Sequence, residues 1–169
     1  MKTTLSSIAL ALFIGQAHIF ADEPVTAKHA LTLEGAKKAG EAASAFAKTN
    51  GASPSIAVVD EGGHLLYFTR SEDSFAAGAN VSIGKAHTAA IFKKPTREFE
   101  EIINKGRFTM TALPDFTPLQ GGVPILHEGQ VIGAIGVSGA KSAQQDEDVA
   151  KAGAAALANS KALAKAEPK

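Results

Sequence analysis

Two short apolar runs on either side of an acidic Gly-Gly tip constrain the fold more than any other part of the sequence. Residues 56–59 (IAVV) and 65–68 (LLYF) flank residues 60–63 (DEGG). Apolar runs of strand length around a glycine-containing turn are typical of a β-hairpin. The first run contains no polar residue, which predicts a central strand that is buried on both faces.

The same pattern recurs later in the chain. Residues 121–126 (GGVPIL) and 131–138 (VIGAIGVS) flank a Glu-Gly turn at 128–129. Gly133 and Gly136 lie inside the second strand, which predicts that a helix, another strand or a ligand approaches the backbone closely there. Two hairpins of this kind predict an antiparallel sheet.

Helical patterns precede, separate and follow the hairpins. They cover residues 33–48 after a possible Thr32 cap, residues 81–92 up to the break at Pro95, residues 97–104 after a possible Thr96 cap, and residues 146–166. The stretch 108–119 between them is irregular and is expected to form a wall or lid. We therefore predict a single α+β domain, residues 22–169, with a central antiparallel sheet flanked by helices.

Composition excludes several classes of function. The chain has 169 residues, enough for one domain with a real core, and its 17 Lys and Arg balance its 17 Asp and Glu. Balanced charge indicates no nucleic-acid footprint and no polybasic membrane surface. The chain has no cysteine, which excludes disulfides, Cys-ligated zinc, iron–sulfur clusters and a cysteine nucleophile.

The N-terminus predicts export. A basic residue precedes the apolar run 5–15, and the small residue Ala21 precedes Asp-Glu-Pro. This pattern is typical of a signal peptide, residues 1–21, with Ala17 as an alternative cleavage position because Ile19 fits the site poorly. The run is shorter than the ~20 apolar residues that a membrane span needs. We expect a periplasmic or secreted protein with no membrane span after cleavage.

Six blocks then occur in order along the chain: residues 57–65 (AVVDEGGHL), 84–90 (GKAHTAA), 94–96 (KPT), 119–125 (LQGGVPI), 131–139 (VIGAIGVSG) and 145–153 (QDEDVAKAG). Together they resemble the GlcG/HbpS-like family, also called the haem-degrading domain family. The resemblance implies a profilin-like or PAS-like fold and a homo-oligomer, for which an octamer is known in the family. It also implies haem or corrinoid binding, and a secreted branch of the family senses haem or redox state with a partner protein.

The sequence departs from the family pattern at two places near the expected pocket. His87 stands where Arg or Trp is common in the family. Residues 71–74 (SEDS) replace a Met-Asp-Gly-Ala segment that often follows the hairpin arginine. Both departures bear on the identity of the ligand.

Histidine is the most common axial donor to haem iron. The resemblance favours His29, because one haem-binding branch uses a histidine in the N-terminal region; the alternative is an exposed polar residue. His87 is either a ligand or a helix histidine packed on the sheet through one hydrogen bond. His64 and His127 are expected to be surface residues.

Other candidate ligand contacts come from the middle of the chain. Lys85 is suited to a haem propionate or another carboxylate, and Gly121 and Gly122 would let a ligand approach backbone N–H groups. Glu98 and Glu101 are three residues apart and share a helix face, so they are candidates for a surface iron site. A similar motif binds iron in the secreted branch; the alternative is a solvated acidic face.

Two functions remain, beside a third interpretation in which the chain is a structural oligomer with an incidental pocket. Ser138 lacks a nucleophile elbow, and the Gly133–Gly136 repeat lies in a strand rather than opening a helix, which argues against a hydrolase and a dinucleotide site. The first function is an exported haem- or tetrapyrrole-binding protein for capture, buffering or redox sensing, with a possible sensor or transport partner, rather than a catalyst. The alternative is an enzyme or accessory protein in small organic acid (glycolate-type) catabolism, with a pocket under Lys85, His87 and the Gly121-Gly122 strand.

Overall fold

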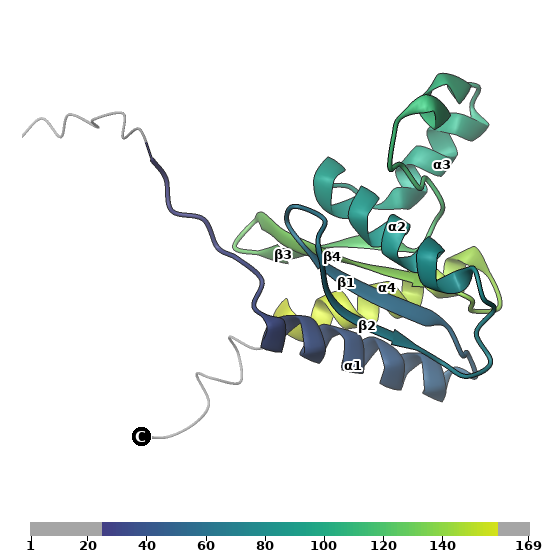
Figure 1. Cartoon of the computed structure of the whole chain (residues 1–169), viewed down its shortest axis with the longest axis horizontal. Coiled ribbons are helices and arrows are strands. Elements are labelled where there is room, and N and C mark those ends of the chain that lie inside the picture. Colours follow the sequence, from purple (N-terminus) through teal and green to yellow (C-terminus); the bar gives the residue numbers. More distant parts are fainter. Residues whose placement is uncertain (1–24, 159–169) are drawn as a thin grey trace, which may run out of the picture.

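The protein is built around a four-stranded antiparallel sheet with strand order β2-β1-β4-β3 (Figure 1). The computed structural model describes residues 25–158, so the expected signal peptide and the predicted helix beyond residue 158 lie outside the described residues. In chain order the elements are α1 Leu33–Thr49, β1 Ser55–Asp60, β2 Leu65–Arg70, α2 Gly78–Phe92, α3 Thr96–Asn104, the 3₁₀ helix η1 Phe108–Ala112, β3 Gly122–His127, β4 Gln130–Ser138 and α4 Ala143–Ala158. The predicted α+β fold with two hairpins in one central sheet is confirmed.

The two hairpins are joined through their inner strands. β1 pairs with β4 along its whole length, from Ser55 opposite Ser138 to Asp60 opposite Gly133. This central position explains why the four residues between Ser55 and Asp60 are all apolar. Ile56 and Val58 pack on one face of the sheet, and Ala57 and Val59 pack on the other.

Helices α1 and α4 cover one face of the sheet together (Figure 1). Alanines of α1 pack against α4 and against Ile56, which allows the two helices to approach closely. A Cβ on Gly153 would lie 2.7 Å from the carbonyl oxygen of Ala39, so only a glycine fits at this crossing. Thr32 caps α1 as predicted, since its hydroxyl accepts a 3.1 Å hydrogen bond from the Gly35 N–H.

Helix α2 covers the opposite face and lies directly on β4. A Cβ on Gly136 would lie 2.1 Å from the Ser82 carbonyl oxygen and 2.5 Å from the Ala86 nitrogen. The strand glycine therefore marks the close approach of a helix, one of the possibilities that the sequence left open. The helix begins at Gly78 rather than at the predicted residue 81. No sequence signal marks this start, because no side chain caps the helix.

The sequence-based assignment of Thr96 as a helix cap was wrong. Pro95 is the N-cap of α3 and Thr96 is its first helical residue. The Thr96 hydroxyl donates to the Leu119 carbonyl at 2.6 Å and accepts from the Gly122 N–H at 2.8 Å. It thus joins α3 to the start of β3, a contact over 26 residues that local patterns do not predict.

Helix α4 also begins earlier than predicted, at Ala143 rather than at Asp146. Asp146 is buried and forms tertiary contacts instead of marking the helix start. None of the described helices combines the length and the apolar character that crossing a membrane requires.

The contact between α2 and β4 leads to a stability prediction. Gly136→Ala should lower the free energy of unfolding by about 3 kcal/mol, at the upper end of overpacking costs, because the added methyl group would lie 2.1 Å from a helix carbonyl oxygen. Urea unfolding measures the change. Gly106→Ala is the control: nothing lies within 4 Å of its Cβ, so only the strain of its positive φ, about 1 kcal/mol, is expected. Equal effects of the two substitutions would contradict the close packing of α2 on β4.

Candidate functional site

A cavity of about 460 Å³ lies between α2 and the segment that follows η1. Its walls combine apolar and polar side chains, and its size is in the range of small-molecule sites. The lining residues are Asn80, Ile83, Gly84 and His87 of α2 together with Leu113, Asp115, Phe116 and Thr117.

Hydrogen bonding and close packing hold the outer wall of this cavity on α2. The Thr117 N–H donates to the Thr88 hydroxyl at 2.8 Å. Thr117 also packs against the backbone of Gly84, where a Cβ would lie only 2.3 Å from its hydroxyl oxygen. An aromatic cluster supports the wall from behind, with ring centroids 5.2–5.3 Å apart and edge-to-face geometry; its members are Phe92, Phe99 and Phe116.

His87 is the lining residue with the clearest chemical potential. Its Nδ1 lies 3.2 Å from the carbonyl oxygen of Gly63 in the β1–β2 turn. A carbonyl only accepts hydrogen bonds, so the proton of the neutral ring is on Nδ1 and the lone pair is on Nε2. A carbonyl partner on one ring nitrogen is the usual support for a histidine that binds a metal through the other.

The position of Gly63 is matched to this histidine. Gly63 has φ +83, and a Cβ there would lie 2.3 Å from His87 Nδ1. The glycine tip that predicted the hairpin therefore also makes room for the imidazole ring. Sequence reasoning identified both features but did not connect them.

Lys85 lies on the opposite side of α2, between the helix and the sheet. Only 3% of the residue is exposed, and its Nζ donates to the Val137 carbonyl at 2.8 Å and to Asp146 Oδ2 at 3.0 Å. Its charge is therefore already compensated by a buried carboxylate. Gly121 and Gly122 lie beside it, where added Cβ atoms would come within 2.9 Å of Lys85 Nζ and 2.4 Å of the Lys85 carbonyl oxygen.

The structure thus brings Lys85, Gly121 and Gly122 together, but in the interior of the protein. These three residues do not line the cavity that contains His87. The sequence placed Lys85, His87, Gly121 and Gly122 around one pocket. In the structure, His87 lies on the cavity side of α2 and the other three lie on its sheet side. Helical periodicity explains the division, because neighbouring residues such as Lys85 and His87 point in different directions around a helix.

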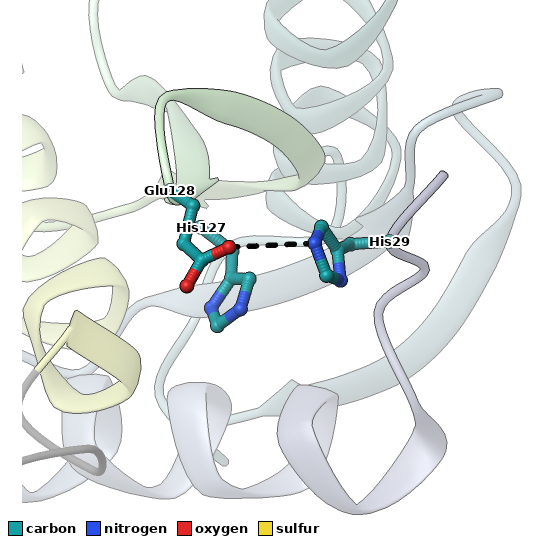
Figure 2. A group of neighbouring side chains, drawn as sticks. All are labelled: His29, His127 and Glu128. Atoms are coloured by element: carbon teal, nitrogen blue, oxygen red, sulfur yellow. Dashed lines mark ion pairs between the residues drawn. The ribbon is translucent and has the colours of Figure 1, made fainter. Parts of the chain in front are cut away.

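His29 lies in a third place, next to the β3–β4 turn (Figure 2). Its Nε2 is 3.6 Å from Glu128 Oε2, and its ring packs edge-to-face with His127 at a centroid distance of 4.8 Å. Sequence reasoning placed His127 near the second turn as a surface residue and considered Glu128 only as part of that turn. Their approach to His29 depends on the path of the segment before α1, for which sequence spacing gives no signal.

Glu98 and Glu101 lie on α3 and pair with separate basic side chains. Glu98 Oε2 is 2.8 Å from Lys94 Nζ, and Glu101 Oε1 is 3.7 Å from Arg97 Nε. Both pairs join residues four apart, but only Arg97 and Glu101 lie together on α3, because Lys94 precedes that helix. Both carboxylates are therefore paired with basic side chains, as expected if they belong to a solvated acidic face rather than to an iron site.

The internal position of Lys85 leads to a prediction about stability. Lys85→Met should reduce the free energy of unfolding by about 3–5 kcal/mol, because it leaves the Asp146 carboxylate buried without a counter-charge. The double substitution Lys85→Met/Asp146→Leu should recover much of this loss. Lys94→Met, which breaks the exposed pair with Glu98, should cost less than about 1 kcal/mol. Chemical unfolding of the four proteins tests the ranking, and a mild effect of Lys85→Met alone would contradict it.

These features define an α+β domain in which a helix-borne histidine opens onto a small-molecule-sized cavity. The chain belongs to the HbpS-like family: the family model described as "Haem degrading protein HbpS-like" matches residues 31–155. The resemblance that the sequence blocks indicated is therefore confirmed.

Known proteins similar to this chain agree with that assignment. Protein GlcG of Escherichia coli K12 is 49% identical over 92 residues, which cover 54% of this chain and 69% of GlcG. A doubly substituted Streptomyces reticuli HbpS has a TM-score of 0.74 and 33% identity, covering 90% of this chain and 99% of that one. A crystal structure of a PduOC–haem complex has a TM-score of 0.69 and 25% identity, covering 76% and 95%.

Proposed function

We propose that this protein is an exported binding protein for haem or a related tetrapyrrole, acting in haem capture, buffering or redox sensing. Family membership and the similarity to PduOC, which was solved with haem, support haem-related binding. The observation that carries the proposal is His87, an imidazole that lines a cavity and has Nδ1 held by a backbone carbonyl.

The residues around His87 suit such a ligand. Nε2 of His87 would be the donor to haem iron, and the haem would supply redox and ligand-binding chemistry at this cavity. Ile83, Leu113 and Phe116 offer apolar contacts for a macrocycle, while Asn80 and Asp115 place polar groups at the same cavity. The substitution of His87 for the more common Arg or Trp of the family thus supplies an iron ligand rather than removing one.

Assembly into a homo-oligomer, possibly an octamer, is part of this proposal. Ile91, Phe108 and Leu113 are 40%, 66% and 41% exposed near the cavity side of α2 and η1. Subunit contacts would cover such side chains and shield a bound tetrapyrrole from water. A sensor or transport protein would act as the further partner.

Hemin titration of the mature, tag-free protein tests the proposal. We expect a saturable, sharpened Soret band, and His87→Ala should weaken binding by ~10-fold or more because it removes the axial donor. His64→Ala is the matched control, since the His64 side chain is 82% exposed and pairs with Asp60 at the turn. Broad, non-saturable absorption would contradict haem binding. If only His29→Ala loses the band, the protein binds haem but the iron ligand is His29 of the N-terminal segment, as the family resemblance implied.

The rival function is an enzyme or accessory role in small organic acid catabolism, for which the similarity to GlcG is the supporting observation. Carboxylate ligands are usually met by Arg or Lys. Among the residues that line the cavity there is neither, and Lys85 is already paired with Asp146. A thermal-shift comparison of hemin with glycolate-type acids separates the two functions, because the rival requires stabilisation by an acid.

Export is a separate prediction. Expressed with its own N-terminus in a Gram-negative host, the protein should be recovered from the periplasm. Intact mass should show a chain that begins at Asp22, or at His18 if cleavage follows Ala17. Recovery of the full-length chain from the cytoplasm or membrane fraction would show that residues 1–21 are not a cleaved signal peptide.

A further inference from the structure

Two histidines and one carboxylate converge at the β3–β4 turn (Figure 2), and none of the three lines the cavity. His29 comes from the segment before α1, His127 from the end of β3, and Glu128 from the turn itself. One ligand atom from each of the three side chains lies within 4.8 Å of the other two. Neutral imidazole and carboxylate together form a donor set that divalent transition metals, and Zn²⁺ in particular, commonly use.

The distances suit a single small ion. Zn²⁺ binds nitrogen and oxygen ligands at about 2.0–2.2 Å with tetrahedral geometry, so two ligand atoms lie about 3.3 Å apart. His29 Nε2 and Glu128 Oε2 are already 3.6 Å apart. The remaining separations are at most 4.8 Å, and rotation of partly exposed side chains closes a gap of this size.

The backbone on both sides positions these groups. The Leu31 side chain is buried in the core, and the His29 N–H donates to Gln130 Oε1 at 3.3 Å, so the N-terminal segment is held against the turn. A register shift between Ile125 and Leu126 in the β3–β4 pairing precedes His127. Such irregularities re-aim the side chains that follow them and are common next to functional sites.

The turn residue itself is unusual. Glu128 has φ +50, a left-handed conformation in which Gly, Asn or Asp is ordinary and most other residues cost about 1 kcal/mol or more. The neighbouring Gly129 accommodates its own positive φ of +80 without this cost. Lys93 and Asp115 have similar positive φ values, so the strain supports a role for Glu128 only together with the position of its side chain. Here the side chain lies beside His29.

We propose that His29, His127 and Glu128 form a binding site for a divalent transition-metal ion, with Zn²⁺ as the best match, and that the ion fastens the segment before α1 to the β3–β4 turn. Three protein ligands leave one position of a tetrahedral ion for water or a further ligand. This site is distinct from the haem cavity and does not depend on haem binding. The competing explanation is a surface ion pair between protonated His29 and Glu128, which contributes about 0–1 kcal/mol.

Calorimetric titration of Zn²⁺ into haem-free, chelator-treated, tag-free mature protein tests the site. We expect one saturable Zn²⁺ per chain, with His29→Ala, His127→Ala and Glu128→Gln each weakening binding by about tenfold or more. His64→Ala is the control, because it removes a histidine that pairs with a carboxylate at the other hairpin turn. This variant should bind Zn²⁺ as the unsubstituted protein does. Absence of saturable binding, or equal binding by all variants, would overturn the metal site.

Amide hydrogen exchange supplies the second readout. Zn²⁺ should slow exchange of residues 25–32 in the unsubstituted protein, because a metal bridge suppresses local opening of this segment. The same addition should have no effect in His127→Ala, whose substituted residue lies outside the segment. Circular dichroism and melting temperature show whether each variant is folded. Tight Zn²⁺ binding without protection of residues 25–32 would overturn the fastening role.

Discussion

The buried ion pair between Lys85 and Asp146 connects the two faces of this protein. Lys85 belongs to α2 on one face of the sheet, and Asp146 belongs to α4 on the other. The pair is well satisfied, since the lysine also donates to the Val137 carbonyl and the aspartate accepts the Ala140 N–H at 2.9 Å. Burying two charges is costly unless hydrogen bonds complete their coordination, and these contacts do so. The pair therefore links α2, which forms one wall of the cavity, to α4 on the other face of the sheet.

The candidate ligand site lies on the outer face of α2, because the inner face packs closely against the sheet. Gly136 and Gly122 let the helix backbone approach the strands, which leaves no room for a ligand between them. His87 then lies at the margin of the sheet, where Gly63 supplies a hydrogen-bond acceptor and the space for the ring. The segment that carries Thr117 packs on the outer side of α2 and forms the other wall of the cavity that His87 lines. The same glycine tip therefore serves the hairpin and the candidate ligand.

Local patterns predicted the elements that depend on neighbouring residues. The buried run of β1, the Thr32 cap of α1 and the two glycine turns were all found where the sequence indicated them. Predictions that assigned a polar residue to its nearest element were less successful. Thr96 binds β3 instead of capping α3, because a hydroxyl buried at an interface meets both a carbonyl and an N–H there. Lys85 faces Asp146 for a similar reason, since a buried ammonium requires a counter-charge.

The sequence by itself determined the α+β class, the two hairpins and the family, because these follow from residue periodicity, turn chemistry and ordered blocks along the chain. Only the tertiary structure decided how the candidate ligands are grouped. It placed His87 and Lys85 on opposite sides of α2. It also brought His29 to His127 and Glu128 across about a hundred residues of sequence. Such groupings depend on long-range packing of segments such as Leu31 against the core, which spacing along a chain does not encode.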